Sequence, residues 1–271
     1  MKYLFLSFLL ILFISCEQQK KKETFKDENP IEQNPIDSLS TITKETILIA
    51  EKDTNQENKG LQNRPKRVID SMDDYQSHIE DFPNHAMVSL SKFIPGISID
   101  LRYAHYDNIF NDILYTQGHA FLNIKAAEAL KKIQQEIAND GYELVIWDAY
   151  RPYSVTVKMW NIIRDARYAA SPQKGSRHNR GMAVDITLKK IDGEYLEMPT
   201  TFDDFSIKAS PLYQNLPQHI KDNRDYLISK MEKHGFKVIT SEWWHFDYQN
   251  WYSVPILDIP FEEMKRVSEK R

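Results

Sequence analysis

The chain changes character near residue 70, and this change limits how much of it can fold. Residues 17–70 are rich in Lys, Glu, Gln, Asn and Asp and lack sustained apolar periodicity, unlike the rest of the 271-residue chain. A segment of this composition cannot bury enough apolar surface to offset the entropy lost on ordering it. We therefore expect a disordered polar tether over residues 17–70 and one folded domain over residues 71–271.

The first sixteen residues, MKYLFLSFLLILFISC, predict an export signal. Lys2 gives a positively charged start, and the apolar run from Tyr3 to Ile14 is too short for a membrane-spanning helix. Ser15 followed by Cys16 resembles the bacterial lipobox, in which the signal is cut and the cysteine is lipidated. The alternative is a plain secretory signal in which Cys16 has no role. Either way we expect an exported protein, and lipidation would anchor it to a membrane, facing the periplasm or the cell surface.

The cysteine content limits the chemistry of the folded domain. Cys16 is the only cysteine, so the domain can form neither an intramolecular disulfide nor a thiolate metal site. Any catalytic metal must therefore be held by His, Asp or Glu. The net charge of −4 also argues against nucleic acid as a partner, because such a surface needs a basic face.

Helical and strand patterns are mixed along the folded domain. Tyr142 to Tyr150, YELVIWDAY, is typical of a buried strand, and FKVI and WWHFDY flank a short turn as in a hairpin. Apolar residues recur at helical spacing in three segments, residues 124–140, 155–166 and 220–234. This mixture predicts an α+β fold with a mainly antiparallel sheet and helices packed against it.

The stretch GSRHNRGMAVDITL places a histidine and an aspartate around a glycine. AVDITL alternates as a strand does, so Asp185 lies on the face opposite to Val184 and Ile186 and can point into a cleft. Gly181 permits a tight bend that would bring His178 over the same cleft. Taken alone, this pair is more typical of a structural loop and strand than of a metal site.

A second stretch, SEWWHFDY, places Glu242 three residues before His245. Two imidazoles and one carboxylate, from His178, Asp185 and His245, form a ligand set suited to catalytic zinc, with a fourth position for water. Glu242 would then be the general base. The alternative is that the aromatic residues of this stretch belong to the core and His245 satisfies a buried polar partner.

The third stretch is WDAYRP, in which Arg151 follows a predicted strand and precedes a predicted helix. A guanidinium at such a place can direct its fixed fork of donors into a cleft and stabilise an oxyanion. The alternative is a surface arginine or one that caps the core.

Together the three stretches resemble the zinc D,D-peptidases, and in particular the VanX-type D-alanyl-D-alanine dipeptidases. SRHNRGMAVD fits the pattern Ser-x-His-x-x-Gly-x-Ala-x-Asp, and EWWH fits Glu-x-x-His, in the family's order and together with its YRP element. The similarity extends from about Ile97 to Tyr248. It implies a zinc D,D-peptidase-like fold and one Zn²⁺ per chain.

The resemblance implies a role for each matching residue. His178, Asp185 and His245 would bind the zinc, Glu242 would be the catalytic base, and Arg151 would polarise the scissile carbonyl and hold the oxyanion.

The same resemblance implies three substrate-binding residues. Ser176 would help to anchor the substrate, Asp203 in TTFDDF would receive the substrate ammonium, and Tyr103 in DLRYAHYDN would lie beside that amine. Met182 and Pro199 depart from the family's usual residues, and we expect them to reshape the pocket.

The implied function is zinc-dependent hydrolysis of D-alanyl-D-alanine to two D-alanines by a zinc-bound water that the glutamate activates. One alternative is a D,D-carboxypeptidase that trims terminal D-Ala from peptidoglycan stem peptides. Another is a non-catalytic lipoprotein that binds cell-wall peptides. Glu242 and Arg151 argue against the latter, because binding alone does not require a general base. The patterns make no prediction about oligomeric state.

Overall fold

The structure is a computed structural model that describes residues 65 and 68–268. The predicted signal at residues 1–16, with Cys16, lies outside the described residues, as does most of the predicted tether. Among the helices of the described part, none is both long and apolar enough to cross a bilayer.

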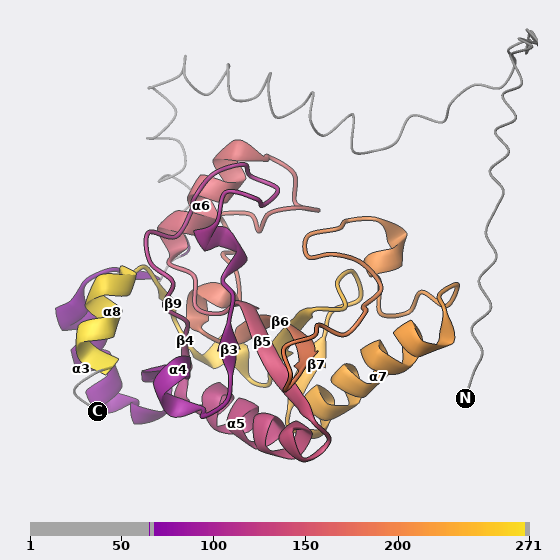
Figure 1. The fold of residues 1–271 in the computed structure, drawn as a ribbon. Coiled ribbons are helices and arrows are strands. Elements are labelled where there is room, and N and C mark those ends of the chain that lie inside the picture. Colours follow the sequence, from indigo (N-terminus) through magenta and orange to yellow (C-terminus); the bar gives the residue numbers. More distant parts are fainter. Residues whose placement is uncertain (1–64, 66–67, 269–271) are drawn as a thin grey trace, which may run out of the picture.

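A five-stranded sheet organises the domain (Figure 1), with strand order β3-β5-β6-β8-β7. The β3–β5 pair is parallel, and the other three pairs are antiparallel. The predicted α+β fold with a mainly antiparallel sheet is therefore confirmed, and the parallel pair at the β3 edge makes the sheet mixed. The strands are β3 (Ser98–Ile99), β5 (Tyr142–Asp148), β6 (Ala183–Lys190), β7 (Phe236–Val238) and β8 (His245–Tyr248).

Two long helices, α5 (Ile124–Asn139) and α7 (Gln218–Lys233), pack beside each other against the sheet (Figure 1). The side chain of Asn123 caps the start of α5 by accepting a hydrogen bond from the Lys125 amide at 2.9 Å. The apolar residues at helical spacing in α5 are buried in the core, as the sequence pattern predicts. Gly141, with φ of +86°, then turns the chain directly into β5.

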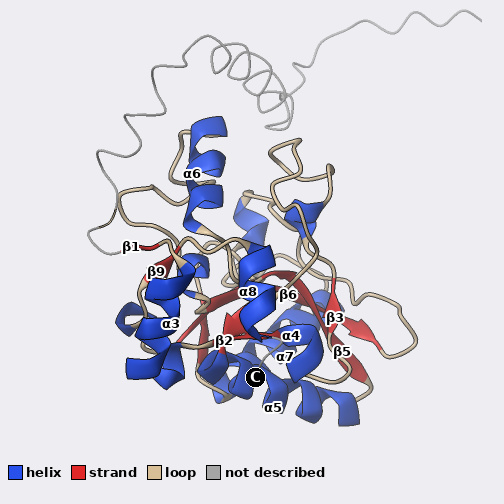
Figure 2. Ribbon diagram, turned by 90° about the vertical axis from the view of Figure 1, so that its left-hand side faces the viewer, coloured by secondary structure: helices blue, strands red, loops and turns tan. Residues whose placement is uncertain are grey.

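Helix α6 (Tyr153–Ile162) lies on the opposite side of the sheet from α5 (Figure 2). The sequence pattern predicts a helix as far as residue 166, but α6 ends four residues earlier. Just beyond its end, the carboxylate of Asp165 accepts a hydrogen bond from the Arg167 amide at 2.9 Å. An aspartate that bonds the backbone two residues on stabilises a turn in place of a helix. The segment that follows this turn, residues 166–170, lines the cavity described below.

The remaining elements close the domain beside the sheet. Val68 and Ile69, at the end of the segment predicted as a tether, form β1 and pair in parallel with β9. Phe261, the first residue of α8, packs against the rings of Tyr115 and Tyr150. These elements are β1 (Val68–Ile69), α3 (Met72–Asp81), β2 (Met87–Ser89), α4 (Leu90–Phe93), β4 (Phe121–Asn123), β9 (Ile256–Leu257) and α8 (Phe261–Ser268), with β2 and β4 pairing antiparallel.

Candidate metal centre and active site

Strand register brings three polar residues side by side at the centre of the sheet. Asp148 at the end of β5 pairs with Asp185 on β6, and Asp185 pairs with His245 on β8. The β5–β6 register shifts between Ile146 and Asp148, which is an irregularity of the β-bulge kind. Such bulges redirect side chains beside functional sites.

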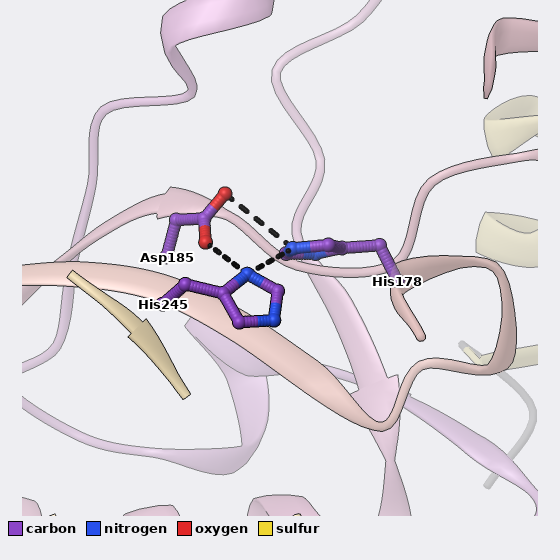
Figure 3. A group of neighbouring side chains, drawn as sticks. All are labelled: His178, Asp185 and His245. Atoms are coloured by element: carbon purple, nitrogen blue, oxygen red, sulfur yellow. Dashed lines mark hydrogen bonds and ion pairs between the residues drawn. The ribbon is translucent and has the colours of Figure 1, made fainter. Parts of the chain in front are cut away.

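His178, Asp185 and His245 form one compact cluster (Figure 3). His178 Nε2 lies 3.1 Å from His245 Nδ1 and 3.4 Å from Asp185 Oδ2. His245 Nδ1 lies 2.9 Å from Asp185 Oδ1. All three side chains are buried. The structure therefore brings together the three residues that the resemblance assigns to the metal.

The spacing of the facing atoms, two imidazole nitrogens and the two oxygens of the Asp185 carboxylate, is close to that of a small cation's tetrahedral site. Zinc bonds of about 2.0–2.1 Å to nitrogen and oxygen place tetrahedral ligand atoms about 3.3–3.4 Å apart. The longest separation in the cluster, 3.4 Å, matches that edge length, and the other two, 2.9 and 3.1 Å, are slightly shorter. Two imidazoles and one carboxylate also leave a fourth position open, as a catalytic zinc site requires.

The ring nitrogens that face away from the cluster are both held by the protein. His178 Nδ1 lies 2.7 Å from the Ala149 carbonyl oxygen, and His245 Nε2 lies 3.0 Å from Asp247 Oδ1. A carbonyl or carboxylate at this position accepts the ring N–H, which fixes the tautomer and directs the other nitrogen's lone pair at the metal. Both rings are therefore oriented as metal ligands.

The charges in the cluster favour a bound cation. Burial disfavours ionisation of Asp185, but His178 and His245 outweigh it and hold the pKa of this carboxyl well below its usual range. Burial likewise disfavours a charged His245, but hydrogen bonds to Asp185 and Asp247 raise its pKa to about 10. Since a metal ion and a proton compete for the same nitrogen, the surroundings that favour protonation of His245 also attract a metal cation.

A tight loop places His178 over the sheet. His178–Arg180 form one turn of 3₁₀ helix, and Gly181 follows in the left-handed region with φ of +58°. A Cβ at Gly181 would lie 2.4 Å from Met87 Cε and 3.0 Å from the Asn123 amide nitrogen. The predicted bend at Gly181 is thus confirmed, and close packing adds a second reason for glycine there.

Glu242 lies in the turn before β8, beside the cluster. Its Oε2 is 4.0 Å from His245 Nδ1, and its side chain is 21% exposed. Burial raises the pKa of Glu242, and the charge of Asp185 raises it further while His245 opposes the shift. A carboxylate with a raised pKa next to the cluster is suited to accept and return a proton.

Arg151 is fixed by a buried ion pair at the end of β5. Its Nε and Nη2 lie 3.0 and 2.5 Å from Asp148 Oδ2, and Tyr115 donates to the other oxygen of that carboxylate at 2.6 Å. Burial alone favours a neutral guanidine, but the Asp148 charge outweighs it and raises the pKa of Arg151. The guanidinium therefore remains charged in a fixed orientation.

Tyr103 and Asp203 form the opposite part of the site. The Tyr103 hydroxyl donates to Asp203 Oδ2 at 3.0 Å, and the Arg151 guanidinium carbon lies 5.1 Å from the centre of the Tyr103 ring. Asp203 has φ of +57°, a left-handed conformation that is uncommon for non-glycine residues, although aspartate and asparagine adopt it more readily than most. Burial and the charges of Asp185 and Glu242 raise its pKa well above the usual range.

These residues line one cavity of about 580 Å³. Ser176 also lies on this cavity, and its hydroxyl accepts a hydrogen bond from the His178 amide at 3.2 Å. Asp203 also borders a larger cavity of about 930 Å³, which lacks all three cluster residues. All eight site residues predicted within the domain line the smaller cavity: Tyr103, Arg151, Ser176, His178, Asp185, Asp203, Glu242 and His245.

Two residues beside the cluster were not predicted from the sequence. Asp247 contacts His245, and Arg177 Nε lies 3.2 Å from Asp247 Oδ2. The sequence holds one signal for the former, since residues 245 and 247 on a strand point to the same face. No pattern indicates the pairing of Arg177 with Asp247, because the two come from different segments.

Known proteins resemble the domain that contains this cavity. A D-alanyl-D-alanine dipeptidase of Escherichia coli (strain K12) is 35% identical over 171 residues, which cover 63% of this chain and 89% of the relative. One of Enterococcus faecium is 29% identical over 178 residues, covering 58% and 88%. The solved structure of the vancomycin resistance D,D-dipeptidase VanXYg, in complex with a D-Ala-D-Ala phosphinate analogue, is 19% identical, with a TM-score of 0.32 and 56% of each chain covered.

The family assignment rests on the sequence relatives and on the family match. Residues 84–262, more than half of the chain, match the M15 peptidase family described as D-Ala-D-Ala dipeptidase. This range contains the whole cluster, Glu242 and every residue placed around them. The chain therefore belongs to the D-Ala-D-Ala dipeptidase family of M15 peptidases.

Proposed function

We propose that this protein is a zinc-dependent dipeptidase that hydrolyses D-alanyl-D-alanine to two molecules of D-alanine. The observation that carries the proposal is the convergence of His178, Asp185 and His245 within 4.8 Å of one another, with Glu242 beside them. Membership of the D-Ala-D-Ala dipeptidase family supports the choice of substrate.

His178, Asp185 and His245 hold the metal. When bound, Zn²⁺ supplies Lewis acidity to the scissile carbonyl and promotes deprotonation of water near neutral pH. Glu242 accepts the proton of the attacking water and delivers it to the leaving amine. Its position suits both steps, because Oε2 lies 4.0 Å from His245 Nδ1 at the edge of the cluster.

Arg151 stabilises the negative charge that develops on the carbonyl oxygen. Asp148 fixes the guanidinium through Nε and Nη2, so that it needs no reorientation during the reaction. Loss of one such fixed donor typically lowers the rate by about 10²- to 10³-fold.

Asp203 and Tyr103 bind the ammonium group of the dipeptide. The raised pKa of Asp203 reflects a buried carboxylate among other negative charges, and an incoming ammonium provides the missing positive charge. The position of Asp203 is consistent with this role, because its carboxylate lies on the cavity wall and accepts a hydrogen bond from the Tyr103 hydroxyl.

Export and lipidation complete the proposal, and they rest on the sequence alone. The lipobox-like Ser15–Cys16 pair would leave a lipidated Cys16 at the start of the mature chain, with residues 17–70 as the tether. Cys16→Ala is expected to prevent incorporation of labelled fatty acid into the protein and to leave the signal uncut.

The role of Glu242 is tested with the full chain. Glu242→Gln is expected to bind zinc at wild-type stoichiometry and to lose at least about 10²-fold in turnover of D-Ala-D-Ala, in line with the usual contribution of general acid–base catalysis. Glu197→Gln is the matched control, because Glu197 pairs with the exposed His219 away from the cavity. Near-normal turnover by the Glu242 variant would show that another group is the base.

A further inference from the structure

Arg177 is a second cationic group held at the active-site cavity. Its Nε lies 3.2 Å from Asp247 Oδ2, and its guanidinium carbon lies 4.8 Å from the centre of the Trp251 ring. The side chain is 45% exposed and lines the same cavity as Glu242 and Ser176. An ion pair on one edge and an aromatic ring on one face together fix the plane of the guanidinium.

The donors of Arg177 are less occupied than those of the other two arginines on the cavity. Arg151 directs Nε and Nη2 at Asp148, and Arg167 directs the same two nitrogens at Asp165. Within the described residues, neither terminal nitrogen of Arg177 has a protein hydrogen-bond acceptor. Its Nη1–Nη2 edge can therefore donate two hydrogen bonds to a carboxylate from outside the protein.

A free dipeptide requires such a group. Its ammonium is accounted for by Asp203, but its carboxylate enters a cavity that already holds the acidic side chains of Asp185, Asp203 and Glu242. The other two arginines on this cavity, Arg151 and Arg167, are already paired with aspartates. Removing a carboxylate from water among like charges is unfavourable unless a cation pairs with it. Ser176, the neighbour of Arg177, accepts from the His178 amide through Oγ and keeps its hydroxyl hydrogen free to donate.

We propose that Arg177, together with the hydroxyl of Ser176, binds the free carboxylate of the substrate. This inference rests on the proposed dipeptidase function and adds a specificity determinant to it. The enzyme then recognises both charged ends of the substrate, with Asp203 at the ammonium and Arg177 at the carboxylate. A dipeptide whose carboxylate is replaced by an amide lacks the second contact.

The test compares D-Ala-D-Ala with D-alanyl-D-alaninamide as substrates of the zinc-loaded full chain. The wild type is expected to favour the acid by at least about 10-fold in kcat/KM, since a charged hydrogen bond contributes about 1.5–3 kcal/mol. Arg177→Gln is expected to lower kcat/KM for the acid by about 10-fold or more, mainly through KM, and to leave the amide within about 2-fold. Arg177→Lys, which keeps the charge without the bidentate fork, is expected to recover part of the acid preference.

The amide substrate distinguishes loss of carboxylate recognition from an indirect effect of Arg177, through Asp247, on the metal site. An indirect effect would lower the hydrolysis of both substrates. If Arg177→Gln leaves the acid-to-amide ratio of kcat/KM unchanged, whether or not it lowers kcat/KM for both substrates, the carboxylate role is overturned. Arg167→Gln is the matched control for loss of a cavity charge, and its acid-to-amide ratio of kcat/KM is expected to remain that of the wild type. A wild type that binds zinc but cleaves neither substrate would instead overturn the dipeptidase function on which the inference rests.

Discussion

The carboxylate of Asp247 offers a quantitative test of how the protein prepares the metal site. His245 Nε2 lies 3.0 Å from Asp247 Oδ1, and this contact leaves Nδ1 directed at His178 and Asp185. Asp247 is mostly buried, with 14% of its side chain exposed. Removal of the carboxylate therefore frees His245 to rotate or to carry its proton on the nitrogen that should bind the metal.

The expected loss follows from that one contact. A hydrogen bond to a charged group contributes about 1.5–3 kcal/mol, which corresponds to about 10- to 150-fold in an equilibrium constant. Asp247→Ala is accordingly expected to weaken zinc binding by about 10- to 100-fold, the usual effect of losing such an outer partner. Asp247→Asn keeps an oxygen acceptor but no charge, and we expect an intermediate affinity.

The assay is competition for zinc between the metal-free full chain and a chelating indicator, which needs no catalytic activity. Asp222→Ala is the matched control, because Asp222 lies on α7 and its carboxylate bonds to Gln218 on the same helix. If Asp247→Ala and the wild type have the same dissociation constant within about 2-fold, Asp247 does not orient His245.

Two further predictions concern stability. Gly181→Ala is expected to lower the free energy of unfolding by at least about 1–2 kcal/mol, because φ is +58° and Met87 and the Asn123 amide leave no room for a Cβ. Thermal unfolding checks this against Gly118→Ala, where a Cβ meets no atom within 4 Å, and equal midpoints would contradict it. Hydrogen bonds from basic residues at the end of α7 lower the pKa of Glu136 from 4.5 to about 2. Because the folded-state value is the lower one, this carboxylate stabilises the fold above about pH 4.5 and loses its effect as the pH falls towards 2. Glu136→Gln is expected to lower stability at neutral pH and to flatten its decline between those pH values; identical pH profiles of the unfolding midpoint would refute the assignment.

Local patterns predicted the elements that depend on local signals. The helix from Ile124 ends just before Gly141, as predicted. The strand and hairpin segments also form, but β5 ends at Asp148 and β8 begins only at His245, after a turn that contains both tryptophans. The predicted end of α6 was wrong, because the helical spacing of apolar residues continues past Ile162. The turn at Asp165 forms because its side chain competes for backbone hydrogen-bonding groups. The spacing of apolar residues carries no information about that competition.

The site was predictable to the extent that its residues lie in short, ordered motifs. His178 and Asp185 share one motif, and Glu242 and His245 share another, so their identities could be read without the fold. Their separations could not, because these depend on the register of β5, β6 and β8 and on the shift before Asp148. Pairings between segments, such as that of Arg177 with Asp247, are set by tertiary packing and leave no local pattern.

The most direct test of the proposed function is the release of free D-alanine by the zinc-loaded enzyme. D-Ala-D-Ala and a stem pentapeptide ending in D-Ala-D-Ala are compared in parallel, with L-Ala-L-Ala as the control for stereochemistry. The proposal predicts release from D-Ala-D-Ala and little from the pentapeptide, because the latter has no ammonium next to the scissile unit for Asp203 to bind. Release from the pentapeptide alone would contradict the dipeptidase function and assign the same zinc site to trimming of peptidoglycan stems.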